Sequence, residues 1–505
     1  MSETASTSDV SFTEQLYLLS TVVPFQGRRV NRITQRWLLG RMRLLDGIAL
    51  LLCTGVKREA VAVTYESTGA GIKLFYCKNR PCDATEKSYA AGLLEIVKNA
   101  VLYENCVVSI MDYIIPECQS KIKSRLGKLV KEVSKLQKSS PGGKISVSPS
   151  ANFDKHIRVT LANSVPSDMS MESFLQVVMD FAEKLPLDNF GLVGDLMEMT
   201  YFIGLARDIH TVIPHPALVW RLKKFGEFFG AAKNIAWITL FDREVSARKK
   251  LITLTEICPA PPVTETITGD SIQILNRFAE SIGTEPVTLE ALKTAYDDFQ
   301  APPGLPIEAN PEAFKEIECS VHCELTLLVF MVQRRLETRK KQYVSMTIEL
   351  GTSKSTCWTC QAYMNHLESC YATPINCDIP HKSLHDLHCV VSDYSGKITA
   401  DWRMPTYCPE KNNWLLPGAL VSIKIQHILA HIHELQQCDS EWELCSNEAL
   451  PDGDDYMEMA SDSDSTTIIG MGDIVTNGSS DDEFLKQISG LFLSGMGLNR
   501  SDLRG

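Results

Sequence analysis

Apolar residues recur every three or four positions through much of the first 255 residues. The spacing is clearest in segments 86–103, 118–138, 171–184, 190–212 and 217–232. It places the apolar side chains on one face of an α-helix. Ser11 and Glu14 have the spacing of a capping box ahead of the first apolar run. We therefore predict a mainly helical N-terminal region over residues 1–257.

Proline-rich segments interrupt the pattern after this region. Segments 258–262 and 301–306 each contain three prolines. Helical spacing returns between them, at 271–283 and 288–299. Because proline inside a helix removes a hydrogen-bond donor and clashes with the preceding turn, these segments end helices. Residues 258–312 are predicted to be proline-rich linkers that contain two helices.

The periodicity then alternates between helical and strand-like. His322 and Glu324 open a run with helical spacing, and residues 343–350 alternate between apolar and polar side chains. After a loop at 351–356, the segment from Cys357 to Cys370 again has helical spacing, and 388–394 reads as a short strand. This order of helix, strand, helix and strand predicts an α/β domain over residues 313–437.

The last segment, 438–505, is rich in Asp, Ser, Gly and Met. Such a composition cannot bury enough apolar surface to fold, so it predicts a disordered acidic tail. Apolar residues at 484–492 fall on one helical face. This short amphipathic helix would either bind a protein partner or pack against the rest of the chain.

Charge and cysteine content limit the classes of protein that fit. The net charge is −12, but fifteen acids lie between Glu434 and Glu483, and no Lys or Arg lies between Ile425 and Leu485. The rest of the chain is therefore mildly basic, which is compatible with nucleic acid. No secretory signal or membrane span is recognisable. We expect an intracellular protein, in the cytoplasm, the nucleus or both, whose sixteen cysteines are mostly reduced.

Two short motifs in the α/β segment carry chemistry. They are His322-Cys-Glu324 and, 33 residues after the glutamate, Cys357-Trp-Thr-Cys360. One imidazole and two thiolates can hold zinc and leave a fourth position for water, while a glutamate beside the histidine moves protons. Each motif is common by chance. Their order, with a helix, a strand and a loop between them, is more specific.

The segment 321–405 resembles the cytidine-deaminase-like superfamily. The shared features are the two motifs, the Gly351-Thr-Ser-Lys354 loop and the Gly396-Lys397 to Trp402-x-x-Pro405 segment. The nearest branch is the one expanded in fungi, with relatives among intracellular bacterial effectors. The resemblance implies a mixed sheet flanked by helices, a catalytic Zn²⁺, and hydrolytic deamination of cytosine or adenine, with nucleic acid or a nucleotide as substrate.

Carried over by position, the resemblance makes His322, Cys357 and Cys360 the zinc ligands and Glu324 the proton shuttle. Two positions depart from the pattern of the family. Cys323 follows the histidine where alanine is usual, and Thr356 stands before the first cysteine where proline is common. Thr356 could still act as the N-cap of the helix that follows.

Three further residues are candidates for substrate binding. Trp358 or Trp402 would stack on the base, although a core tryptophan is the stronger interpretation for each. Lys354 would either meet a phosphate or be solvated, and the sequence favours neither.

Two alternatives remain at this stage. Cys357, Cys360, His366 and Cys370 could instead form a structural zinc site. The chain could also be a non-catalytic zinc-binding interaction protein or scaffold that keeps a deaminase-like fold. Glu324 favours the enzyme, because a scaffold has no need of a proton shuttle.

Overall fold

The computed structural model describes residues 10–22, 29–30, 36–55, 59–139, 147–148, 150–161, 169–185, 190–298, 314–338, 346–372, 387–395, 397–405 and 421–433. The chain divides into two compact units, which are treated separately. The first includes the described parts of 1–118 and 231–467, and the second those of 119–230. Among the described residues, no helix is long and apolar enough to cross a membrane.

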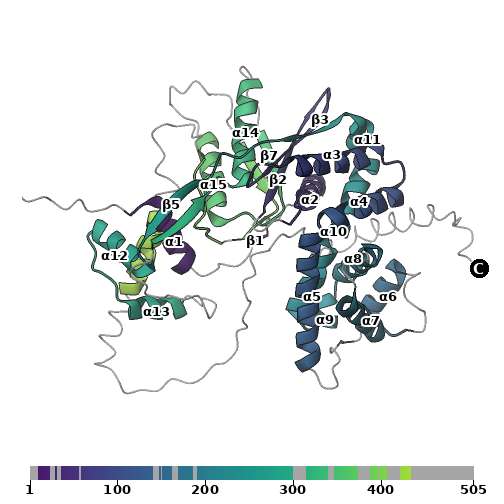
Figure 1. Ribbon diagram of the computed structural model, residues 1–505, viewed down its shortest axis with the longest axis horizontal. Coiled ribbons are helices and arrows are strands. Elements are labelled where there is room, and N and C mark those ends of the chain that lie inside the picture. Colours follow the sequence, from purple (N-terminus) through teal and green to yellow (C-terminus); the bar gives the residue numbers. More distant parts are fainter. Residues whose placement is uncertain are drawn as a thin grey trace, which may run out of the picture. The chain divides into compact units, whose positions relative to one another are not determined.

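A mixed five-stranded sheet forms the centre of the first unit (Figure 1). Its order is β4 (Ile252–Glu256), β3 (Gly71–Lys78), β2 (Val61–Thr68), β7 (Met346–Thr352) and β8 (Leu387–Val391). The outer pairs β3–β4 and β7–β8 are parallel, whereas β2 is antiparallel to both β3 and β7. The pairing of Val63 with Gly351 fixes the register between β2 and β7.

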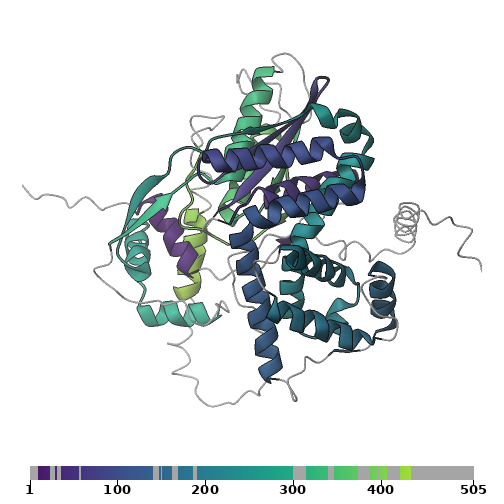
Figure 2. The same cartoon turned by 45° about the vertical axis from the view of Figure 1, so that its right-hand side comes forward.

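Helices cover both faces of this sheet (Figures 1 and 2). Helix α14 (Cys323–Thr338) lies against β2, β3 and β7, and α2 (Arg36–Leu51) lies against β2 and β7. The alternation in β7 explains this arrangement. Ile348 and Leu350 belong to the apolar core shared with α14, whereas Glu349 pairs with Arg41 of α2 at 2.6 Å. Helix α15 (Trp358–Ala372) connects the parallel strands β7 and β8 and packs on β8.

The first unit contains further helices and short strands. They are α1 (Phe12–Val22), β1 (Arg29–Val30), α3 (Ala84–Asn99), α4 (Tyr103–Glu117), α11 (Arg243–Arg248), the 3₁₀ turn Lys249–Leu251, β5 (Val263–Thr268), α12 (Ser271–Ser281), α13 (Leu289–Asp298), β6 (Phe314–Cys319), β9 (Asp393–Tyr394) and a helix at 421–433. The capping box of α1 is confirmed, because Ser11 and Glu14 exchange backbone-to-side-chain hydrogen bonds of 3.0 and 3.2 Å.

The second unit is helical. It contains α5 (Gln119–Ser139), α6 (Ala151–Thr160), α7 (Met171–Lys184), α8 (Phe190–Leu205) and α9 (Ile209–Val212). Helix α10 (Pro216–Phe241) contributes residues to both units. The apolar stripe of α5 is buried as its spacing predicts, with Leu126, Leu129 and Val133 almost fully enclosed.

The predicted fold class is confirmed, with one important difference. The N-terminal region is mainly helical, and helices α14 and α15 and strands β7 and β8 follow in the expected order. However, β2, β3 and β4 lie within residues 1–257, where mainly helices were predicted, and they supply three of the five strands of the sheet. The predicted boundaries at 257 and 312 therefore do not separate the sheet from the N-terminal region. The acidic tail and its short helix lie outside the described residues.

Candidate metal centre

The site is built at the first turns of two helices. His322 stands directly before α14, where its carbonyl accepts hydrogen bonds of 3.0 Å from the amides of Leu325 and Thr326. Cys357 stands directly before α15, where its carbonyl accepts a 3.0 Å bond from Gln361 N. Both residues are therefore N-caps, and Glu324 and Cys360 lie within the first turn of their helices.

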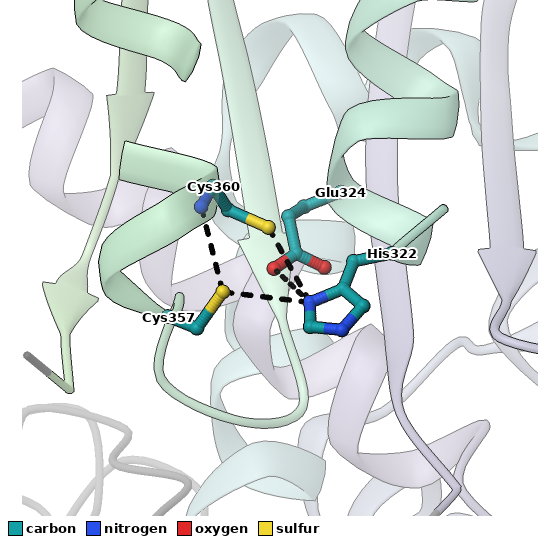
Figure 3. A group of neighbouring side chains, drawn as sticks. All are labelled: His322, Glu324, Cys357 and Cys360. Carbon is teal, nitrogen blue, oxygen red and sulfur yellow. Dashed lines mark hydrogen bonds and ion pairs between the residues drawn. The ribbon is translucent and has the colours of Figure 1, made fainter. Parts of the chain in front are cut away.

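Four side chains from these two turns converge (Figure 3). Nδ1 of His322 lies 3.5 Å from Sγ of Cys357 and 3.3 Å from Sγ of Cys360. Oε1 of Glu324 is 3.8 Å from the same nitrogen. All four donor atoms lie within 4.8 Å of one another. In the part of the chain that the structure describes, this is the only group of three or more His, Cys, Asp or Glu residues with such a spacing.

The donor set fits zinc. Bond lengths of about 2.05 Å to nitrogen and about 2.3 Å to sulfur at tetrahedral angles imply a nitrogen-to-sulfur separation of about 3.6 Å. The observed separations of 3.5 and 3.3 Å agree closely with this value. Thiolate and imidazole together are the ligands that zinc prefers. His322, Cys357 and Cys360 would therefore hold the ion, and Glu324 is close enough to face its fourth position.

The polarity of the site favours a thiolate. Burial alone raises the pKa of the Cys357 thiol, but the hydrogen bond with Cys360 and the charge of His322 outweigh burial and hold that pKa well below its usual value. The amide of Cys360 is in the first turn, where amides have no carbonyl partner within the helix, and it donates a 3.4 Å hydrogen bond to Sγ of Cys357. The positive end of the helix dipole acts in the same direction.

The pKa values of His322 and Glu324 are shifted by each other's charge. Burial opposes the charged form of His322, but Cys357 and Glu324 raise its pKa well above the usual value. Burial would raise the pKa of Glu324, but the hydrogen bond and charge of His322 lower it. Because zinc binds neutral imidazole and thiolates, metal binding at these residues should release protons.

The two departures from the family pattern have different consequences. Cys323 is buried, and its Sγ lies 3.4 Å from Oε2 of Glu324, so it packs against the carboxylate without leaving the core. The suggestion that Thr356 caps α15 is wrong. Its hydroxyl is buried without a partner among the described residues, and the sulfur of Cys357 accepts the capping hydrogen bond instead. Helix α15 begins at Trp358, so Cys357, and not Thr356, occupies the N-cap position.

A strap formed by the described residues of 393–405 joins the two helix starts. Thr356 N donates to Asp393 O at 3.2 Å, and Trp358 N donates to Lys397 O at 2.9 Å. At its other end, Ser320 N donates to Asp401 O, and Arg403 N donates back to Ser320 O, both at 2.9 Å. The strap therefore contacts the segment before each ligand-bearing helix.

The three candidate substrate-binding residues differ in exposure. Trp402 is 1% exposed, and its Nε1 lies 3.2 Å from Sγ of Cys360. This position matches the core interpretation, and it leaves no ring face open for stacking on a base. Trp358 is half-buried, with the ammonium of Lys424 over its ring at 5.1 Å. Lys354 is half-buried in the loop before Cys357. The structure does not bring either residue into the four-residue cluster.

Among the described residues, the alternative structural zinc site is not formed by Cys357, Cys360 and His366. His366 lies along α15, outside the group of donor atoms around Cys357, and the side chain of Cys370 lies outside the described residues. His366-Leu-Glu368 is a second His-x-Glu motif in the sequence, and its Glu368 accepts a hydrogen bond from the amide of Cys389 in β8. His388 is exposed on β8.

Sequence reasoning missed the residues that hold the loop before Cys357. The carboxylate of Asp46 in α2 accepts a 2.8 Å hydrogen bond from Thr352 N. Ser353 exchanges two 2.8 Å hydrogen bonds with the backbone of Val61. These partners lie about 300 residues away in the chain, so no local spacing could reveal them. The one available signal was an aspartate, Asp46, inside an apolar helix.

Comparison with known proteins supports a deaminase. Residues 321–406 match a family model described as an OTT_1508-like deaminase. The match covers the two motifs, the loop between β7 and α15, and the strap. No curated protein and no solved structure matches the chain significantly. The segment that carries the candidate metal centre is therefore the segment that is similar to a deaminase family.

Proposed function

We propose that this protein is a zinc-dependent deaminase that acts on cytosine or adenine, within a nucleotide or a nucleic acid. The observation that carries the proposal is the convergence of His322, Cys357 and Cys360 around Glu324 within a segment that matches a deaminase family. A structural zinc site uses four protein ligands, whereas a catalytic site keeps one position open. Three N and S donors with a neighbouring carboxylate correspond to the second arrangement.

A bound zinc ion would supply the nucleophile, because it lowers the pKa of a coordinated water molecule to about 7. Glu324 is placed to accept the proton of that water. In the proposed reaction it then passes protons to the ring nitrogen and to the departing amine, which leaves as ammonia.

The first turns of α14 and α15 would assist this chemistry. Both helices begin at the cluster, so the positive ends of their dipoles lie beside it. This field stabilises the negative charge that the thiolates carry and the charge that develops as the nucleophile attacks. The buried surroundings strengthen the field, because water does not screen it.

The choice of a nucleotide or nucleic acid rests on charge and on the family resemblance. Away from its acidic C-terminal segment the chain is mildly basic, so a polyanionic substrate is not repelled. Trp358 and Lys354 flank the start of α15 and are the residues that we propose for contact with a base or a phosphate.

The experiment is an ammonia-release assay of the zinc-loaded full chain on cytidine, adenosine, their nucleotides, and single-stranded DNA and RNA. Glu324→Gln should bind zinc as the wild type does and lose activity by a factor of about 10² or more. Glu368→Gln is the matched control, since Glu368 belongs to the second His-x-Glu motif and only supports β8. Equal activity in Glu324→Gln and wild type, or no activity of the wild type on any of these substrates, would reject the proposal.

A further inference from the structure

Trp402 donates a hydrogen bond to a candidate zinc ligand, Cys360. Its side chain is almost completely buried. The indole N–H can only donate, so the 3.2 Å contact between Nε1 and Sγ of Cys360 is an N–H···S hydrogen bond. Neither the core role nor the stacking role considered for this tryptophan accounts for that bond.

The backbone around Trp402 is fixed by the other half of the site. Ser320 exchanges 2.9 Å hydrogen bonds with Asp401 and Arg403, the two neighbours of Trp402, in a parallel bridge. Ser320 lies two residues before His322. The backbone on either side of Trp402 is thus hydrogen-bonded to the segment just before His322, while the side chain of Trp402 is hydrogen-bonded to Cys360.

Cys360 needs such a donor. Its side chain is fully buried, and it would have to be a thiolate to hold zinc. A buried thiolate without donors is costly. A hydrogen bond to a charged sulfur in surroundings of low polarity is stronger than one between neutral groups.

We propose that Trp402 is a positioning residue of the metal centre, whose indole N–H orients the Cys360 thiolate and reduces the electron density that this sulfur donates to zinc. The inference rests on the proposed function only in requiring that the site binds a metal. Hydrogen bonds from outside the ligand set commonly fix the orientation and electronic character of metal ligands. A sulfur that donates less electron density would leave the zinc ion a stronger Lewis acid toward its fourth ligand.

The test compares two changes to the same aromatic contact. Phe12 packs edge-on against Trp402, with ring centroids 5.9 Å apart. Trp402→Phe removes the N–H and keeps an aromatic ring, whereas Phe12→Leu disturbs the packing and keeps the N–H. A tryptophan analogue at position 402 with sulfur in place of the indole nitrogen preserves the ring shape and serves as the third variant, in case Trp402→Phe does not fold.

The readouts are the zinc dissociation constant, from competition with a chelator, and the sulfur-to-cobalt charge-transfer absorption of the Co²⁺-loaded full chain. Trp402→Phe and the analogue should weaken zinc binding about 10-fold or more and shift the cobalt band, while Phe12→Leu should leave the band at the wild-type position. Unchanged zinc affinity and an unchanged band in the analogue would overturn the inference.

The outcome is separable from that of the proposed function. If the wild type binds no zinc or cobalt, both the metal centre and this inference fail. If the wild type binds metal but shows no deaminase activity, the role of Trp402 can still be supported. If Trp402→Phe and Phe12→Leu shift the band and the affinity equally, Trp402 only fills space, and the inference is wrong.

Discussion

Two regions of the first unit build the site in different ways. The segment from β6 to the strap contains every candidate ligand, and its chemistry lies in two short motifs. The region from α2 to β3 contributes no ligand, yet it provides β2 and β3 of the sheet and holds the loop before Cys357 through Asp46 and Val61. The site therefore depends on a region that carries none of its chemistry and lies outside the family match.

The contact between α2 and β7 shows how the loop before Cys357 depends on α2. A Cβ atom on Gly351 would lie 2.2 Å from the carbonyl carbon of Leu45 and 2.5 Å from the amide nitrogen of Asp46. Only glycine permits such an approach of a strand to a helix. The loop that begins there leads within six residues to Cys357.

The largest expected effect comes from removing the region from α2 to β3, together with the rest of the chain before β6. A fragment of residues 314–433 lacks α2, β2 and β3, so β7 loses its antiparallel partner and α14 loses the apolar strand residues Ala62, Phe75 and Cys77. We expect no cooperative thermal unfolding of this fragment by circular dichroism, whereas the full chain should unfold cooperatively. A fragment that melts cooperatively and binds zinc would show that the two regions are independent.

Lys78→Met should have the next largest effect. Lys78 is 2% exposed and pairs with Glu59 and Glu86 at the end of the β2–β3 hairpin. Removing it takes the lysine counter-charge away from the buried carboxylates of Glu59 and Glu86, at a cost of about 3–5 kcal/mol in the free energy of unfolding. Lys73→Met, on the same strand but with no recorded ion pair, should change stability by less than about 0.5 kcal/mol. Similar urea midpoints for the two variants would contradict the structure of this cluster.

Gly351→Ala tests the contact between the regions directly. The added methyl group must push α2 away from β7, so we expect a loss of about 1–3 kcal/mol in stability together with weaker zinc binding, because the loop to Cys357 moves. Gly40→Ala is the control in α2, where a Cβ meets nothing within 4 Å and should stabilise the helix by up to about 1 kcal/mol. If both variants behave like the wild type, the close approach is not required.

The smallest effect is a dependence of stability on pH. Burial alone would raise the pKa of Glu86, but hydrogen bonds from Arg80 and Lys78 lower it to about 2. A lowered pKa means that the ionised group stabilises the folded state above its unfolded pKa of about 4.5, and that this stabilisation is lost as the pH falls toward 2. The stability difference between wild type and Glu86→Gln, from urea denaturation, should therefore shrink between pH 6 and pH 3. A constant difference would contradict the ion pairs.

The sequence predicted the clustering of the four candidate residues better than it predicted the sheet, and the reason is physical. His322, Glu324, Cys357 and Cys360 are brought together by two helix starts whose positions local periodicity reveals. The strands β2 and β3 pair with each other locally, but β2 joins β7 across almost 300 residues. Short buried strands have no periodicity that distinguishes them from helical segments. The position of Trp402 beside Cys360 likewise depends on tertiary packing.

The central claim is that one metal ion is held by His322, Cys357 and Cys360. The most direct measurement is the zinc content per chain of the purified full-length protein and of Cys357→Ser/Cys360→Ser after dialysis against a weak chelator. We predict one zinc per chain in the wild type and none at this site in the double variant. Equal zinc content in the two proteins, or a zinc-free wild type that stays zinc-free in the presence of excess ion, would contradict the assignment.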